Sequence, residues 1–144
     1  MLQRFELVNG SPKETGSNEA SVWVYINPDS EENELISRTH DIDKHTIESA
    51  LDPDEISRLE FEDEGIYIIW KRPKNYIGSD NLLFGVSSIG LFLFKEKLVV
   101  VLPEDVTLFD SKQHADSLMD VVINFLYNSI RHYLDHIKAM KLIS

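Results

Sequence analysis

An apolar run over residues 82–102 constrains the fold more than any other part of this sequence, because Lys95-Glu96-Lys97 interrupts its centre. The run has the length of a membrane-spanning helix, but three consecutive charges at that depth would cost several kcal/mol each. A β-hairpin that turns at the charges explains the pattern, with residues 90–94 paired to residues 98–102. We therefore expect a β-sheet and no membrane-spanning segment within these 144 residues.

Further strands and two short helices are predicted before this hairpin. The β-branched and aromatic residues 22–26 indicate a buried strand, and residues 59–62 and 66–70 indicate a second hairpin around an acidic turn. Asp29, with Glu32 three residues later, is typical of a helix N-terminus, and a second helix is expected over residues 43–51. Residues 9–21 are rich in Gly, Ser, Asn and Pro and are expected to form a loop.

The C-terminal part of the chain has a heptad pattern. Apolar residues recur there at alternating spacings of four and three, at Met119, Ile123, Leu126, Ile130, Tyr133, Ile137 and Met140. We expect a long helix from about Lys112 to the end, whose first half packs on the domain and whose second half meets another helix. The chain is thus divided into an α/β domain over residues 1–111 and a helix over residues 112–144.

The charge of the protein is concentrated in one segment. The net charge is −11, and residues 29–64 hold 14 acidic and 3 basic residues, so that the rest of the chain is neutral. Such a charge opposes binding to nucleic acid and to anionic membranes. Two interpretations of the segment remain open: a solvated face that keeps the protein in solution, and a surface that gathers cations.

Motifs for catalysis are missing from the sequence. It has no cysteine, no Gly-rich phosphate loop, no G-x-S-x-G elbow and no H-E-x-x-H. Glu60, Glu62 and Glu64 alternate along one predicted strand and are expected to form an exposed face rather than a metal cage. The residues alone therefore predict an acidic α/β module that is not an enzyme.

Four segments of the sequence resemble, in their order and spacing, the N-terminal cytoplasmic part of the CorA family of magnesium transporters. They are a Trp-bearing strand that leads through proline into an acidic helix, a helix followed by an Arg-x-Glu turn and a strand, a hairpin, and the start of a long helix. In this sequence they are Val22–Glu32; Ile47–Leu51 with Ser57–Glu60 and Gly65–Ile69; Val86–Val101; and Phe125–Ile137.

The resemblance implies a fold and a function. The fold would be an α/β structure with a mixed sheet sandwiched by helices, ending in a long helix that leads towards a membrane-proximal helical stalk. The function would be that of a regulatory, ion-sensing domain on the cytoplasmic side of the inner membrane, in a homo-pentameric transporter of Mg²⁺ or another divalent cation. The pore, and the only contact with the membrane, would lie beyond Ser144, so this part would not conduct ions itself.

The resemblance also implies one metal ligand. Glu48 matches the first member of an acidic pair on the family's second helix, where regulatory Mg²⁺ is held between neighbouring subunits. Ser49 stands where described members have an aspartate, and Arg131-His132 stands where an acid precedes the helical tyrosine. The alternative function is a stand-alone soluble module whose acidic face and terminal helix bind a protein partner.

Overall fold

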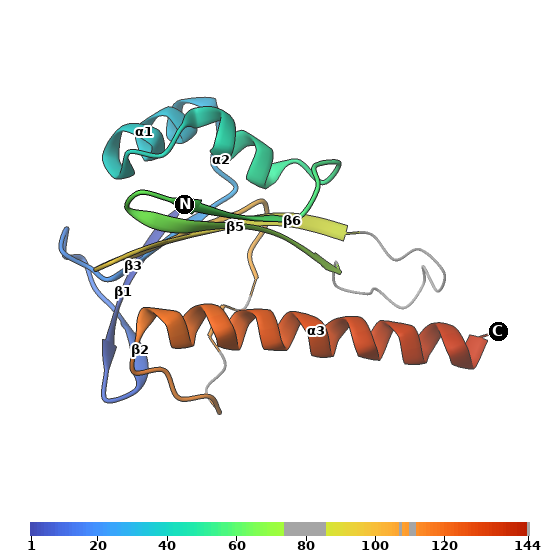
Figure 1. The fold of residues 1–144 in the computed structure, drawn as a ribbon. Helices are drawn as coiled ribbons and strands as arrows, with labels where there is room; N and C mark the ends of the chain where they lie inside the picture. The colour runs from blue at the N-terminus through green and yellow to red at the C-terminus, as the bar shows by residue number, and fades with distance from the viewer. Residues whose placement is uncertain (74–85, 107, 110–111, 144) are drawn as a thin grey trace.

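The protein is a three-layer α/β sandwich. The computed structural model describes residues 1–73, 86–106, 108–109 and 112–143. Helices α1 (Ser30–His40) and α2 (Lys44–Leu51) cover one face of a seven-stranded sheet, and helix α3 (Leu118–Ile143) runs across the other face (Figure 1). This arrangement confirms the α/β fold with a mixed sheet between helices and a long C-terminal helix.

The sheet is antiparallel except at its centre. Its strands are ordered β2-β1-β3-β7-β6-β5-β4, and only β3 and β7 run parallel among the described strand pairs. Their bounds are β1 Leu2–Val8, β2 Ser11–Glu14, β3 Val22–Ile26, β4 Arg58–Glu62, β5 Gly65–Pro73, β6 Val86–Phe94 and β7 Leu98–Leu102. The hairpin expected around Lys95-Glu96-Lys97 is confirmed as β6 and β7, and the hairpin around the acidic turn as β4 and β5.

The two faces of the sheet bury two separate apolar clusters. Alternate residues of a strand point to opposite faces, and in β3 and β7 both sets are apolar, so these strands are buried on both sides. Val22, Val24 and Val100 pack against α3, whereas Trp23 and Val99 pack against α1 and α2. A helix layer on each face is therefore required by the sequence of the central strands.

The N-termini of α1 and α2 are built as the sequence predicts. The side chain of Asp29 accepts a hydrogen bond from the Glu32 backbone at 2.8 Å, and the Glu32 side chain accepts one from the Asp29 backbone, which completes a capping box. Asp43 caps α2 by accepting from the His45 backbone at 2.9 Å. These contacts fix the residues at which α1 and α2 begin.

The loop predicted over residues 9–21 is wrong in its first part, which forms a β-hairpin. β1 and β2 pair with Val8 opposite Ser11, so Asn9 and Gly10 are the only turn residues. Both have positive φ, 52° at Asn9 and 80° at Gly10, as the tight hairpin turn with the sheet's twist requires. The Asn-Gly pair, a strong hairpin signal, outweighs the low strand propensity of Ser11-Pro12-Lys13-Glu14.

Helix α3 begins at Leu118, six residues later than the predicted start at Lys112. Ser117 and Asp120 form a reciprocal cap: the Asp120 backbone donates to the Ser117 hydroxyl at 3.1 Å, and the Ser117 backbone donates to the Asp120 carboxylate at 3.2 Å. This cap fixes the first turn of α3. Whether the chain divides functionally near residue 111 stays a prediction.

One side of α3 packs on the sheet and another remains exposed. Val121, Val122 and Phe125 are buried in the cluster beneath the sheet, while the Tyr133 hydroxyl donates to the Lys71 carbonyl oxygen at 2.9 Å, near the end of β5. An exposed apolar row follows the other side, at Met119, Ile123, Tyr127, Ile130, Leu134 and Ile137. The helix continues past the strands in Figure 1.

Candidate functional site

The acidic segment, residues 29–64, forms one layer of the molecule and one edge of the sheet. It includes α1, α2, the connection after α2, strand β4 and the turn before β5. Because its carboxylates are spread over several elements, their individual contacts decide which of them could hold a cation.

Several of these carboxylates are used to cap backbone. Asp29 and Asp43 cap the two helices, and the Asp52 carboxylate accepts from the Asp54 backbone at 2.9 Å in the turn after α2. Oxygen atoms engaged with backbone N–H groups satisfy donors that a helix or turn would otherwise leave unpaired. Part of the acidic excess is therefore explained by local structure.

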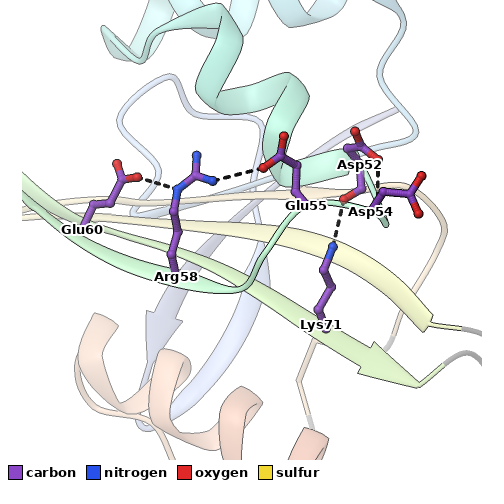
Figure 2. A network of polar contacts seen from close by, with 6 residues as sticks. All are labelled: Asp52, Asp54, Glu55, Arg58, Glu60 and Lys71. Atoms are coloured by element: carbon purple, nitrogen blue, oxygen red, sulfur yellow. Dashed lines mark hydrogen bonds and ion pairs between the residues drawn. The ribbon is translucent and has the colours of Figure 1, made fainter.

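Arg58 neutralises a second group of carboxylates. Its guanidinium stands between Glu55 and Glu60 and donates to both, at 3.4 Å to Glu55 (Figure 2). Lys71 of the neighbouring strand donates to the Asp52 carbonyl oxygen at 2.9 Å in the same network. These contacts tie the connection after α2 to the β4–β5 edge, so Glu60 is not simply an exposed acid.

Glu48, the predicted metal ligand, lies on α2 with 47% of its side chain exposed. Its carboxylate is 3.8 Å from the Lys44 ammonium, one helical turn earlier, and Lys44 also donates to the Ser30 hydroxyl at 3.3 Å. Glu48 is thus accessible, but in a single copy it faces a lysine rather than other carboxylates. Its role as a ligand stays a prediction.

Three further carboxylates of the segment, Asp41, Asp63 and Glu64, line a cleft of about 1060 Å³ between the C-terminus of α1 and two hairpin turns. Its lining includes five acids and two lysines: Glu19, Asp41, Asp63, Glu64, Glu96, Lys95 and Lys97. The register of β5 against β6 places Gly65 opposite Phe94, which brings the β4–β5 turn beside the β6–β7 turn. The strand pairing therefore assembles this acidic cleft from distant parts of the chain.

Tyr67, on the wall of an adjoining hollow of the cleft, reports the negative field there. Burial raises the pKa of its hydroxyl, and the charges of Glu62, Asp41 and Glu64 raise the same pKa further. A field of this sign attracts cations. The cleft is the strongest candidate for a cation-attracting surface in the described part of the chain.

His40 closes the inner wall of the cleft and is buried. The Lys97 ammonium lies 2.8 Å from its Nδ1, and the Tyr25 hydroxyl lies 2.8 Å from its Nε2. Since an ammonium group can only donate, Nδ1 accepts and the ring proton is on Nε2. Burial, together with the nearby Lys97 charge, lowers the pKa of His40 to about 4, and burial raises the pKa of Tyr25 to about 12.

No group of three or more His, Asp or Glu side chains among the described residues converges as a metal site would require. Mg²⁺ prefers oxygen ligands in near-octahedral geometry, and Glu48 provides one such ligand only. The second expected acidic position is occupied by Arg131, whose guanidinium lies 5.9 Å from the centre of the Tyr127 ring. It therefore provides no carboxylate ligand to accompany Glu48. Within one copy, the described residues do not fit a Mg²⁺ site.

Sequence reasoning missed both the cleft and the environment of His40. Asp63-Glu64 and Lys95-Glu96-Lys97 were identified as turns of two hairpins, but their proximity depends on the register of β5 against β6. The consecutive order of the two hairpins could have indicated that their turns meet. His40 has no signal in the sequence, because its partners come from β3 and from the β6–β7 turn.

Comparison with solved structures gives the same architecture. The soluble domain of CorA from Methanocaldococcus jannaschii matches 98% of this chain with a TM-score of 0.67 and 18% identity. The chain has the fold of that CorA domain. The complete CorA magnesium transporter from the same organism matches 96% of the chain, with a TM-score of 0.64 and 15% identity. The cytoplasmic domain of ZntB from Vibrio parahaemolyticus matches 94%, with a TM-score of 0.61 and 14% identity.

The match is one of fold and covers part of each CorA-like structure. This chain spans 60% of the CorA soluble domain, 48% of the complete transporter and 61% of the ZntB domain. No family model matches the sequence, and no curated protein is significantly similar to it. Among the helices described, none has the length and apolar character to cross a membrane.

Proposed function

We propose that this chain is the regulatory, ion-sensing part of a CorA-like transporter of divalent cations, on the cytoplasmic side of the inner membrane. The observation that carries the proposal is the correspondence of 98% of the chain with the CorA soluble domain. In this proposal the ion path belongs to another part of the transporter. The role of the described domain is to respond to the ion, without catalysis.

The response is proposed to occur between copies of the chain. Glu48 is exposed on α2 and lacks further acidic ligands in its own copy, so a bridging Mg²⁺ would need oxygen ligands from a neighbouring subunit. Carboxylates that face one another across a subunit boundary repel unless a divalent cation lies between them. Ion occupancy then favours the assembled arrangement, and loss of the ion favours a looser one.

A homo-oligomer, five-fold in the complete transporter, is part of this proposal. The exposed apolar row on α3 supports it, because it offers a helix face without a partner among the described residues. The acidic cleft supports the proposal differently, since its field would raise the local concentration of cations near the domain.

The test is a Mg²⁺ titration of the 144-residue chain. Millimolar MgCl2 is expected to raise the Tm or the mass in solution more than NaCl of equal ionic strength does. The NaCl control is needed because screening alone relieves repulsion among exposed acids. The metal salt alone is the probe, and differential scanning fluorimetry and multi-angle light scattering are the readouts.

Two glutamate variants localise the effect. Glu48→Gln should remove most of the Mg²⁺-specific response, whereas Glu34→Gln, which removes an exposed carboxylate from α1, should leave it intact. A third variant, Asp63→Asn with Glu64→Gln, tests whether the cleft contributes to the Mg²⁺-specific response.

An equal response to MgCl2 and NaCl in the wild-type chain would contradict the ion-sensing proposal. The acidic protein-interaction module would then be the better interpretation of the same surface. A Mg²⁺-specific response that Glu48→Gln leaves unchanged would retain the sensing function and remove Glu48 from it.

A further inference from the structure

The two edges of the sheet are protected to different degrees. The edge strand β2 carries Pro12 and Lys13, and proline and lysine at an edge oppose pairing with another strand. The opposite edge strand, β4, reads Arg58-Leu59-Glu60-Phe61-Glu62 and contains neither residue. β4 is therefore the less protected edge, and a further strand must provide partners for its charged residues Arg58, Glu60 and Glu62.

The hydrogen bonds of the sheet identify which β4 groups face outwards. The Phe94 N–H donates to the Lys97 carbonyl oxygen at 2.8 Å, so the backbone groups of Phe94 point towards β7. N–H and C=O groups of successive strand residues point to alternate sides. Following the strand pairings from β6 to β5 and then to β4, the backbone groups of Arg58, Glu60 and Glu62 bond to β5. Those of Leu59 and Phe61 point away from the sheet.

The side chains of the same two residues are apolar and exposed. Leu59 is 55% exposed and Phe61 is 76% exposed, opposite Ile68 and Ile66 of β5. Both isoleucines pack in the cluster on the α3 side of the sheet. Within the described part of the chain, the outward backbone groups of β4 have no strand partner, and its exposed side chains extend that apolar cluster. This combination favours strand addition.

We propose that β4 is a docking site for β4 of a second copy of this chain, paired antiparallel about a two-fold axis at Glu60. In this register Leu59 of each copy lies opposite Phe61 of the other, and these are the residues with outward backbone groups. Each such pair exchanges two backbone hydrogen bonds. The two pairs also join the exposed apolar side chains of both copies on one face.

The charges of β4 fit the same register. Arg58 of each copy lies opposite Glu62 of the other, so opposite charges meet at both ends of the paired strands. The two Glu60 side chains meet at the axis, but each is already bound by Arg58 of its own copy, which reduces their repulsion. A shift of one residue would lose the Arg58–Glu62 pairs and place Leu59 opposite a residue with inward backbone groups.

The association is expected to be weak and to strengthen with salt. A single pair of five-residue strands covers less area than the 1,200–2,000 Å² of stable complexes, so a Kd of about 100 µM is expected. Each copy carries a net charge of −11, and added salt screens this repulsion. Sedimentation equilibrium of the 144-residue chain up to about 1 mM should therefore show a monomer–dimer equilibrium that shifts towards dimer with NaCl.

A pair of matched lysine variants tests the location. Leu59→Lys is expected to weaken dimerisation at least tenfold. Leu35→Lys replaces a leucine of the same 55% exposure on α1 and should leave the dimer unchanged. If Leu59→Lys leaves the dimer unchanged, or if Ile123→Lys on α3 abolishes it, the β4 contact is wrong.

Charge reversal tests the register. Arg58→Glu alone and Glu62→Arg alone each place like charges at both ends, and each variant should be monomeric. An equimolar mixture restores both opposite-charge pairs in a heterodimer and should recover dimer. A wild-type chain that stays monomeric to about 1 mM, or a mixture no more dimeric than its components, overturns the proposal. Circular dichroism confirms that each variant is folded.

The proposed contact does not depend on the transporter function, and its two-fold axis cannot relate neighbours within a five-fold ring. In a complete transporter it would therefore join chains of two separate rings. It requires no divalent cation, so the sedimentation experiments are performed with EDTA present. A Mg²⁺-independent dimer blocked by Leu59→Lys supports the β4 contact whatever the outcome at Glu48. A Mg²⁺ response that survives Leu59→Lys supports the ion-sensing proposal independently.

Discussion

Lowering the pH from about 7 to about 4 is expected to destabilise this fold through His40. The imidazole is 4% exposed, and the Lys97 ammonium lies 2.8 Å from its Nδ1. Protonation would force Nδ1 to release the Lys97 hydrogen bond and would place two positive charges side by side in a partly buried position. The folded protein therefore keeps His40 neutral, whereas the unfolded chain accepts a proton readily.

The size of the effect follows from the two pKa values. In the unfolded chain His40 titrates near 6.5, and in the folded protein its pKa is about 4. Between these values the unfolded state binds more protons, so the free energy of unfolding falls as the pH is lowered through 6.5 and becomes constant below about 4. Since one pH unit corresponds to about 1.4 kcal/mol, the full loss is about 3 kcal/mol.

The assay is urea denaturation at a series of pH values, with His40→Gln as the reference. Glutamine keeps a donor and an acceptor for Tyr25 and Lys97 but has no proton to gain. Carboxylates titrate in the same range in both proteins, so the wild-type value minus the variant value isolates His40. That difference should fall by about 3 kcal/mol between pH 7 and pH 4, with most of the fall below pH 6.

The NMR titration of the His40 ring protons gives an independent check. The ring should remain neutral at pH 5.5, well below the usual histidine pKa. A titration midpoint near 6.5, or a stability difference that stays within 0.5 kcal/mol over the whole range, would refute the buried Lys97–His40–Tyr25 arrangement.

Two local substitutions test a helix cap and a hairpin turn. Asp29→Ala removes the hydrogen bond that the Asp29 side chain accepts from the Glu32 backbone, and keeps the one from the residue 29 backbone to the Glu32 side chain. It should lower the free energy of unfolding by about 1 kcal/mol, while Glu34→Ala on the same helix should change it by less than about 0.5 kcal/mol, both by urea denaturation. Gly10→Ala adds a Cβ 1.7 Å from the His114 ring at a residue with φ of 80°. Thermal unfolding should show that Gly10→Ala lowers the free energy of unfolding. About 1 kcal/mol of this loss should persist in the Gly10→Ala/His114→Ala double variant, which removes the clash but keeps the backbone strain. Full recovery in the double variant would contradict backbone strain as a cause.

The sequence was most informative where one local pattern decides the structure. The interrupted apolar run predicts β6 and β7, and Asp29 with Glu32 predicts the start of α1, because in each case the deciding residues are neighbours in the chain. The β1–β2 hairpin was missed although Asn9-Gly10 signals it. There the composition of the surrounding residues suggested a loop, and the turn geometry decides otherwise.

The functional surfaces were less predictable because they depend on pairings between distant residues. The acidic segment was visible as a charge excess and Asp29 as a helix cap, but the sequence could not show which of the other carboxylates line the cleft. Arg58, between Glu55 and Glu60, neutralises part of the predicted exposed face. The late start of α3 has a local cause instead: Ser117 and Asp120, three residues apart, cap a helix whose apolar pattern has no sharp beginning.

The parallel pairing of β3 with β7 has a consequence for how the chain folds. The other described strand pairs join strands that are neighbours in sequence or lie close along the N-terminal part of the chain. This pairing instead aligns Val22–Ile26 with Leu98–Leu102, with residues 27–97 between them. Closing so long a loop is entropically costly, and contacts of this kind slow folding. The N-terminal strands and the β4–β7 hairpins can therefore form early as separate units, and the central pair, which lies in both apolar clusters, is the step that commits the chain to its native state.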